Sequence, residues 1–112
     1  MSQLTKKKAA VRLTQIGQSI EKRRLLTLTL SKPSRPAKKS LYFLATHHGD
    51  EPISSLVVLA ILKFFADNID QKSTQKILSH FSLIFQPIVN PDGYVKKLRT
   101  NSMGIDLNRT YS

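Results

Sequence analysis

The residues best suited to chemistry are His48 and Glu51, which stand three apart in the string His-Gly-Asp-Glu. An imidazole nitrogen and a carboxylate oxygen are both zinc ligands, and a catalytic zinc site typically uses three protein ligands and a water. The string lies between two apolar segments, so a loop between a strand and a helix is expected. Such pairs also arise by chance, and Glu51 beside a helix start favours the helix dipole without any metal.

A second histidine–acid pair, His47 and Asp50, has the same spacing one residue earlier. The residue types alone do not choose between the two pairs, because a histidine next to a ligand can also support that ligand from behind. His80 stands alone before a later apolar segment and is interpreted as an ordinary side chain. Spacing therefore leaves both pairs open as metal ligands.

A second group of polar residues follows in a segment of weak periodicity. Asn-Pro-Asp-Gly at 90–93 has proline second and glycine fourth, which predicts a type I turn. Arg99, Asn108 and Arg109 come next. A guanidinium binds a carboxylate through two parallel hydrogen bonds, although each of these residues singly also fits an ordinary charged surface.

The composition indicates one globular domain with a strongly basic balance. The 112 residues are 40% hydrophobic and 22% charged, with a formal net charge of +11. Such a surface attracts polyanions, but charge runs are often simply solvated. The absence of cysteine excludes disulfides and cysteine-based sites, and it agrees with an expected cytoplasmic location. The longest apolar stretch, 56–66, contains Lys63 and is too short for a bilayer, so no membrane partner is expected.

The elements that position these residues are predicted to form an α/β fold. Alternating leucine and threonine predict a half-buried strand at 24–30, and continuous apolar runs predict buried strands at 41–46 and 81–89. Apolar residues at helical spacing over 52–66 predict a crossover helix between the two buried strands. The loop that carries His48 would then join a strand end to the helix start.

Taken in order, these strings resemble the M14 family of zinc carboxypeptidases. The similar region is residues 16–112, the N-terminal portion of a catalytic domain, and it follows a basic arm at 1–15. The resemblance implies a partial zinc-carboxypeptidase-like mixed sheet with a crossover helix, truncated before its later strands. It rests on Ile-Gly-Gln-Ser-Ile at 16–20, His-Gly-Asp-Glu-Pro at 48–52, Asn-Pro-Asp-Gly-Tyr at 90–94 and Gly-Ile-Asp-Leu-Asn-Arg at 104–109.

The resemblance also implies a role for each matching residue. His48 and Glu51 would bind Zn²⁺, and Arg99 would polarise the scissile carbonyl and stabilise the oxyanion. Asn108 and Arg109 would hold the free carboxylate of a peptide substrate. The motif forms look most like the murein peptide amidase branch, whose relatives cleave cell-wall peptides between D-glutamate and meso-diaminopimelate.

The sequence departs from the family pattern after Arg109. Thr110 and Tyr111 stand where the family continues with asparagine and an aromatic residue, and no later histidine follows. The only glutamates are Glu21 and Glu51, so the third zinc ligand and the general base are missing. We therefore expect the chain alone to be inactive, with an unpaired sheet edge and exposed apolar surface. A complementary C-terminal half is a candidate partner.

The alternative from another class is a basic module that binds nucleic acid. The charge supports it, but the three tyrosines and five phenylalanines are not interleaved with basic residues in a stacking pattern. A salt-dependent shift with an oligonucleotide would favour this alternative. Zinc-dependent protection by a cell-wall tripeptide would favour the peptidase.

Overall fold

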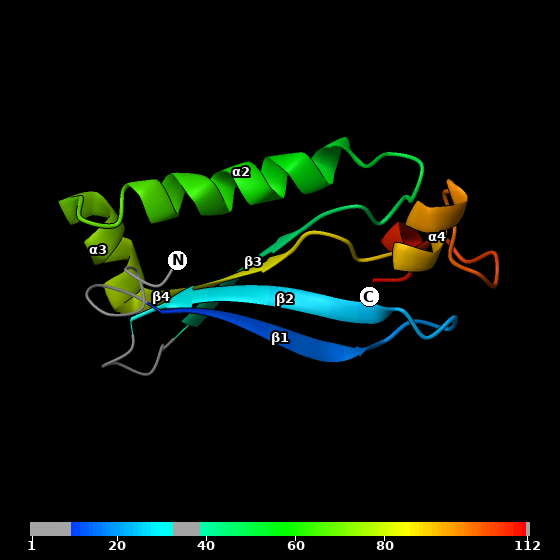
Figure 1. Ribbon diagram of the computed structural model, residues 1–112, viewed down its shortest axis with the longest axis horizontal. Coiled ribbons are helices and arrows are strands. Elements are labelled where there is room, and N and C mark those ends of the chain that lie inside the picture. Colours follow the sequence, from blue (N-terminus) through cyan, green and yellow to red (C-terminus); the bar gives the residue numbers. More distant parts are fainter. Residues whose placement is uncertain (1–9, 33–38, 112) are drawn as a thin grey trace.

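The computed structural model describes residues 10–32 and 39–111, which form a mixed four-stranded sheet with α2 along one face and α3 at one end (Figure 1). The strand order is β1-β2-β4-β3, in which β4 pairs antiparallel with β2 and parallel with β3. This architecture confirms the predicted α/β class with a mixed sheet and a crossover. The elements in chain order are β1 (Ala10–Gln18), β2 (Arg24–Ser31), β3 (Lys39–Leu44), α2 (Ile53–Asp67), α3 (Lys72–His80), β4 (Phe81–Gln86), α4 (Pro91–Lys96) and the 3-10 helix η1 (Leu107–Arg109).

The hydrophobic core lies between the sheet and α2. Leu30 of β2 pairs directly with Leu83 of β4, and both are fully buried. Phe85 stacks on Phe43 of β3 with ring centroids 4.8 Å apart. Val58, one turn into α2, packs on this layer. Because the strand side chains alternate between faces, these apolar residues all point toward the helix.

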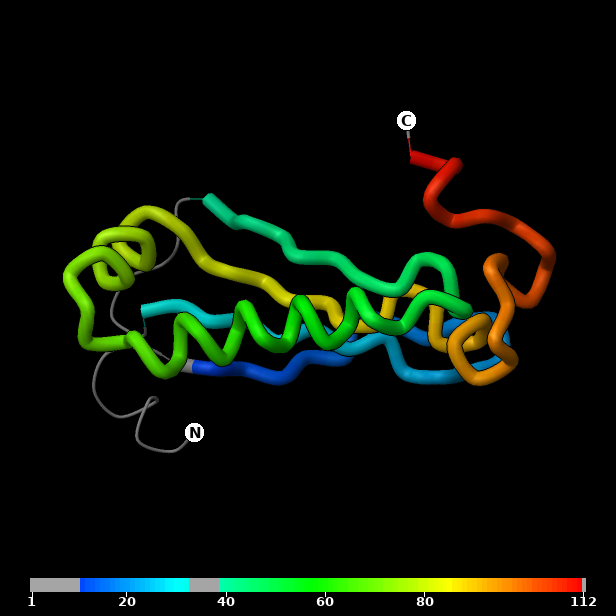
Figure 2. The backbone as a smooth tube through the Cα atoms, turned by 90° about the horizontal axis from the view of Figure 1, so that it is seen from above, coloured from blue at the N-terminus to red at the C-terminus, as the bar shows by residue number. Residues whose placement is uncertain are grey.

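The loops with candidate chemistry gather at one end of the sheet. β3 and β4 are parallel, so their carboxyl ends lie at the same edge, where α/β sheets commonly bind ligands. The segment after β3, the helix α4 and the chain from 97 to 111 all lie at this end (Figure 2). The β1–β2 hairpin reaches the same end. Among the described residues, no helix has the length and apolarity to cross a membrane.

Two predicted strands differ from what the structure shows. The segment 41–46 was expected to be buried on both faces, but β3 is the edge of the sheet and Tyr42 is 64% exposed. The later strand ends at Gln86 instead of residue 89, directly before Pro87, which cannot donate to a strand neighbour. In the described residues β3 leaves one edge unpaired, and large apolar side chains are exposed both on β3 and on α2.

Two segments take a different form from the predicted one. Residues 90–93 do not form an isolated type I turn, because they begin α4, with Asn90 as its N-cap. The Asn90 side chain accepts a hydrogen bond from the Gly93 N–H, which satisfies a free amide of the first turn. Residues 10–15, expected within a basic arm, belong to β1. Residues 1–9 of that arm lie outside the described residues, and the domain division at 16 stays a prediction.

Candidate functional site

The loop after β3 is tied to both of its neighbours. Thr46 has a left-handed φ of 55°, and its backbone N–H donates to Ser54 Oγ at 2.9 Å. Its hydroxyl lies 2.5 Å from Ser55 Oγ, which donates in turn to the Pro87 carbonyl at 2.6 Å. The Asn90 N–H donates to the Thr46 carbonyl. These bonds fix the loop between the start of α2 and the segment after β4.

Asn90 joins the loop to the rest of the site. Its side chain is 2% exposed, and Nδ2 donates to the carbonyls of His47 and Thr100, each at 3.0 Å. The loop also passes very close to α4, because a Cβ added at Gly49 would lie 2.0 Å from the carbonyl carbon of Gly93. Only a residue without a side chain fits there. The buried Asn90 amide therefore ties the loop at His47 to the backbone at Thr100.

His48 lies between two carboxylates. Its Nδ1 is 2.8 Å from Glu51 Oε2, and its Nε2 is 3.0 Å from Asp106 Oδ1. The His48 side chain is 13% exposed, whereas that of Glu51 is well exposed. A neutral imidazole has one N–H and cannot donate to both carboxylates. If a cation bound His48 Nδ1 and the Glu51 carboxylate, the single ring proton would lie on Nε2 and donate to Asp106. These two groups are therefore a suitable pair of ligands for a zinc ion.

The neighbouring pair is arranged differently. His47 Nε2 lies 2.6 Å from the hydroxyl of Tyr111, and the two rings meet edge to face. Partial burial, together with the nearby His48, lowers the pKa of His47 and favours its neutral form. Asp50 is exposed. His48 and Glu51 are thus the pair whose side chains meet, and their roles as zinc ligands stay a prediction.

Asp106 is the residue that brings the candidate site together. Its Oδ2 accepts from Arg99 Nε at 3.0 Å, while Oδ1 accepts from His48 and from the Asn108 N–H. Partial burial raises the pKa of this carboxyl, but the three hydrogen bonds outweigh that effect and hold the pKa below its usual range. Sequence reasoning gave Asp106 no role. The only signal was its place in the string Gly-Ile-Asp.

The three residues predicted to handle substrate lie beside this carboxylate. Arg99 is half exposed and uses Nε for Asp106; neither of its terminal nitrogens bonds another described residue. Asn108 and Arg109 lie on η1, where the Arg109 Nη1 donates to the Asn108 carbonyl at 3.2 Å. The structure therefore gathers His48 and Arg99 around Asp106, with Asn108 bound through its backbone, and Glu51 joins this group only through His48. The Arg109 side chain is exposed and folds back on its own turn.

Behind the site, a buried carboxylate fixes the β1–β2 hairpin to α4. Asp92 is 2% exposed and accepts four hydrogen bonds. Burial raises its pKa, but these bonds outweigh the burial and lower the pKa to about 2. Sequence reasoning assigned Asp92 only to a turn. Its donors are Ser19 Oγ (2.6 Å), Arg23 Nη1 (2.9 Å), the Glu21 N–H (3.1 Å) and Ser102 Oγ (3.0 Å).

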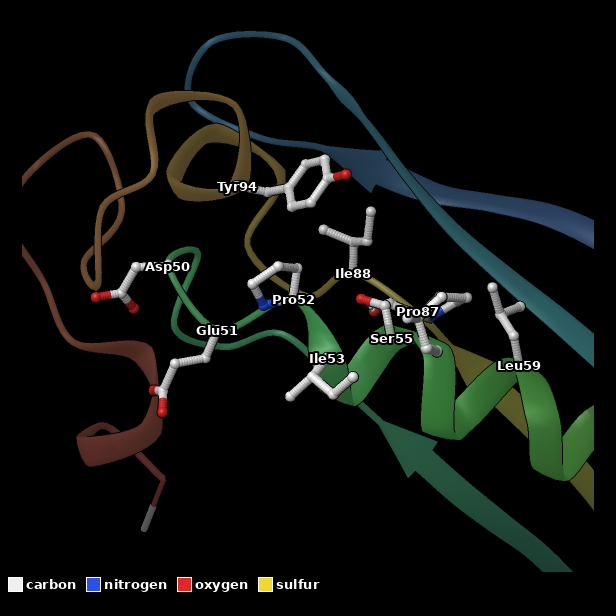
Figure 3. A pocket seen from close by; sticks show the side chains of 10 residues that line it. Asp50, Glu51, Pro52, Ile53, Ser55, Leu59, Pro87, Ile88 and Tyr94 are labelled. Atoms are coloured by element: carbon white, nitrogen blue, oxygen red, sulfur yellow. Dashed lines mark hydrogen bonds between the residues drawn. The ribbon is translucent and has the colours of Figure 1, made fainter.

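A groove of about 780 Å³ runs along the first turns of α2 (Figure 3). Asp50 and Glu51 lie at one end of it and Leu59 at the other, and its walls are mostly apolar. His48, Arg99 and Asp106 do not line this groove. Of the candidate metal ligands, Glu51 lines the groove and His48 does not, so the groove lies beside the candidate site.

The metal site has two candidate protein ligands. In the part of the chain that the structure describes, no group of three or more histidine, cysteine, aspartate or glutamate side chains is placed to hold a metal ion. Asp106 is engaged by Arg99 and by His48 Nε2, on the opposite side of the ring from Glu51. The described residues therefore form no complete catalytic zinc site, and His48 and Glu51 stay candidate ligands.

Comparison with known proteins gives a consistent result. The sequence matches the family Peptidase_M14, described as zinc carboxypeptidase, over residues 1–112. It is 30% identical to carboxypeptidase SOL1 of Arabidopsis thaliana over 117 aligned positions, which cover 99% of this chain and 23% of that protein. The chain therefore spans about a quarter of the length of this relative.

Solved structures with the same fold are also larger than this chain. Thrombin-activatable fibrinolysis inhibitor superposes with a TM-score of 0.80 at 27% identity, covering 99% of this chain and 32% of its own. A metallo-carboxypeptidase from Burkholderia cenocepacia superposes with a TM-score of 0.76 at 29% identity, covering 96% of this chain and 30% of its own. In both, the matched region is about a third of a longer chain.

Proposed function

The chain belongs to the M14 zinc carboxypeptidase family, and we propose that it supplies one part of a zinc-dependent site for peptide hydrolysis. The observation that carries the proposal is the position of His48, with Glu51 at Nδ1 and Asp106 at Nε2. A histidine whose second nitrogen is held by a carboxylate is a common arrangement for a metal ligand, because the carboxylate fixes the tautomer and the ring orientation.

In this proposal His48 Nδ1 and the Glu51 carboxylate hold Zn²⁺. Zinc, when bound, supplies a Lewis acid for the scissile carbonyl and lowers the pKa of a bound water. Asp106 keeps the His48 ring in place and orients Arg99 at the same time. The Arg99 nitrogens that are not used by Asp106 donate to the developing oxyanion.

The substrate in this proposal is a peptide with a free carboxylate. Asn108 and Arg109 are exposed on η1, next to Asp106, where an amide and a guanidinium can bind that carboxylate. Within this class we propose a cell-wall peptide, because His-Gly-Asp-Glu-Pro at 48–52 and Arg-Thr-Asn at 99–101 resemble the murein peptide amidase branch. A cytoplasmic location is part of the same proposal.

Hydrolysis requires groups that these residues do not supply. The third histidine of the sequence, His80, ends α3 and bonds the Lys76 carbonyl. The second glutamate, Glu21, pairs with Arg23 and Lys96 beside the hairpin. We therefore propose that the third ligand and the general base come from polypeptide outside the 112 residues.

Peptide binding tests the substrate half of this proposal without requiring turnover. The probe is the cell-wall tripeptide L-Ala-γ-D-Glu-meso-diaminopimelate, compared with the same peptide whose carboxylates are amidated, both titrated by NMR with zinc present. We expect shifts at Arg99, Asn108 and Arg109 with the free acid, weakened by about tenfold or more in Arg109→Ala.

The matched control is Lys97→Ala, another exposed cation, which bears no assigned role. It should leave the shifts unchanged. Equal binding of the acid and the amidated peptide, or an Arg109→Ala variant that binds like wild type, would contradict the assignment of the carboxylate site.

A further inference from the structure

Thr46 has a backbone conformation that its own side chain disfavours. Its φ of 55° lies in the left-handed region, where Cβ crowds the following carbonyl oxygen and a branched side chain is a genuine outlier. Among the described residues, two other non-glycine residues have positive φ: Lys22 in the β1–β2 connection and Lys97 at the C-cap of α4. Both are unbranched, and left-handed residues are common where helices end. Thr46 is instead branched and only 3% exposed, so its surroundings must hold it in this conformation.

The groups that hold Thr46 are two serine hydroxyls from the first turn of α2. Ser54 Oγ accepts the Thr46 N–H at 2.9 Å and lies 3.2 Å from Thr46 Oγ1. Ser55 Oγ lies 2.5 Å from Thr46 Oγ1 and donates to the Pro87 carbonyl at 2.6 Å (Figure 3). Because a hydroxyl has one proton and Ser55 uses its own on Pro87, the proton between Thr46 and Ser55 belongs to Thr46. Thr46 therefore donates to Ser55, and Ser55 donates to the segment after β4.

These bonds close the base of the loop that carries the candidate zinc ligands. Thr46 and Ser54 are eight residues apart, and His48 and Glu51 both lie between them. Inside the loop, the Glu51 N–H donates to the His48 carbonyl at 3.1 Å. On the other side of Thr46, its carbonyl accepts from the Asn90 N–H. The directions of the His48 and Glu51 side chains therefore depend on where Thr46 is held.

The left-handed conformation also sets the direction of the chain. An extended residue at 46 would continue β3 along the segment after β4, because the backbone of Ala45 still pairs with that segment. A left-handed residue ends the extended run and turns the loop before His48. Glycine would take this conformation without strain, but glycine has no hydroxyl that could donate to Ser55. Threonine thus combines the turn with an attachment to α2.

We propose that Thr46 is a positioning residue for the candidate zinc ligands, because its hydroxyl, bound to Ser55, keeps the loop closed so that His48 and Glu51 meet. Thr46 acts through the loop, since none of its hydrogen bonds goes to His48 or Glu51. The proposal rests on the proposed function, in which these two residues bind Zn²⁺. If the bonds of Thr46 only stabilised the fold, the zinc affinity of the folded chain would not depend on the hydroxyl.

Three changes at residue 46 separate the hydroxyl from the strain. Thr46→Ser keeps the hydroxyl, Thr46→Val keeps the branched shape without it, and Thr46→Gly removes both the hydroxyl and the strain. Zinc affinity should follow the hydroxyl: within about twofold of wild type in Thr46→Ser, and about tenfold weaker in Thr46→Val and Thr46→Gly. Stability should follow the strain, so Thr46→Gly should have a higher Tm than Thr46→Val. Ser55→Ala removes the other end of the same bond and should match Thr46→Val in zinc affinity.

The probe is Zn²⁺ alone, titrated into the full chain and followed by the NMR shifts of His48 and Glu51, which measure even a weak affinity. Hydrogen exchange of the Asn90 amide gives a measurement that needs no zinc, because this N–H donates to the Thr46 carbonyl. Loss of the Thr46 hydroxyl should speed this exchange by about tenfold relative to the Leu83 amide in the core. The matched control is Thr74→Val, at a threonine of α3 that is also 3% exposed, and it should leave both measurements unchanged.

Weaker zinc binding in Thr46→Val and Thr46→Gly, with wild-type affinity in Thr46→Ser, supports the proposal. Wild-type affinity in Thr46→Gly, or an equal loss in Thr46→Ser or in Thr74→Val, overturns it. If Zn²⁺ shifts neither His48 nor Glu51 in the wild type, the proposed function fails and hydrogen exchange alone decides on the positioning role. A larger rise at Asn90 than at Leu83 in Thr46→Val then supports that role, and an equal rise at both amides overturns it.

Discussion

Asp92 is the residue whose change should affect the architecture of the site most. Asp92→Asn keeps the size of the side chain but removes its charge and one acceptor oxygen. The carboxylate accepts from Ser19, Arg23, the Glu21 N–H and Ser102, and it is 2% exposed. An amide can accept at only one atom, and its NH₂ group would face donors.

The magnitude follows from the pKa. The folded pKa of Asp92 is about 2, against an ordinary value of 3.8. At 1.36 kcal/mol per unit, the ionised form contributes about 2 kcal/mol to the free energy of unfolding. Unsatisfied donors add to this loss, so Asp92→Asn should cost about 3 kcal/mol at pH 7. Because the folded pKa is lowered, the contribution is complete above about pH 4 and is lost as the pH falls toward 2.

Urea unfolding monitored by circular dichroism at pH 7, 5 and 3 measures this directly. The difference between wild type and Asp92→Asn should be largest at pH 7 and 5 and should shrink by about 1 kcal/mol or more toward pH 2 to 3. Asp70→Asn, at an exposed aspartate between α2 and α3, is the control and should change stability by less than about 0.5 kcal/mol. A loss below about 0.5 kcal/mol in Asp92→Asn, or one that does not change with pH, would refute this reasoning.

Three further changes have defined outcomes. Gly49→Ala places a Cβ 2.0 Å from the Gly93 carbonyl carbon, so thermal unfolding should show a loss of about 2 kcal/mol or more, whereas Gly17→Ala, whose Cβ would lie 3.8 Å from Leu25 Cδ1, should lose less. Asn90→Ala leaves the His47 and Thr100 carbonyls without their donor and should cost about 2–4 kcal/mol by urea unfolding; a loss below about 1 kcal/mol would contradict the role of this amide. Asp106→Asn should weaken zinc binding by about 10- to 100-fold in calorimetry, and unchanged affinity would show that it does not support His48.

The sequence was sufficient for the parts of the fold that depend on local pattern. The apolar period over 52–66 predicted α2 to within one residue at each end, and the two apolar runs located β3 and β4. Strand exposure was predicted less well, because the pattern of β3 indicates an interior strand that the described residues leave at an edge. Periodicity reports which faces are apolar and cannot report what covers them.

The sequence predicted contacts within the site only between residues that are close together along the chain. His48 and Glu51 are three apart, and the loop brings them together. The choice against His47 depends on Tyr111, which lies 64 residues further along the chain. Asp106 and Asp92 were assigned no role, because each bonds a residue far away in the sequence: His48, 58 residues from Asp106, and Ser19, 73 residues from Asp92. Spacing cannot reveal such contacts, and the motif strings point to them only through family resemblance.

The central claim is that His48 and Glu51 hold one zinc ion, and titration calorimetry with Zn²⁺ tests it most directly. We expect weak 1:1 binding, because two of the usual three ligands are present. His48→Ala and Glu51→Gln should each abolish it. His80→Ala should not change it, because among the described residues this side chain bonds Ser79 and the Lys76 carbonyl, both in α3. Binding that survives both of the first two changes, or that is lost in His80→Ala, would contradict the account.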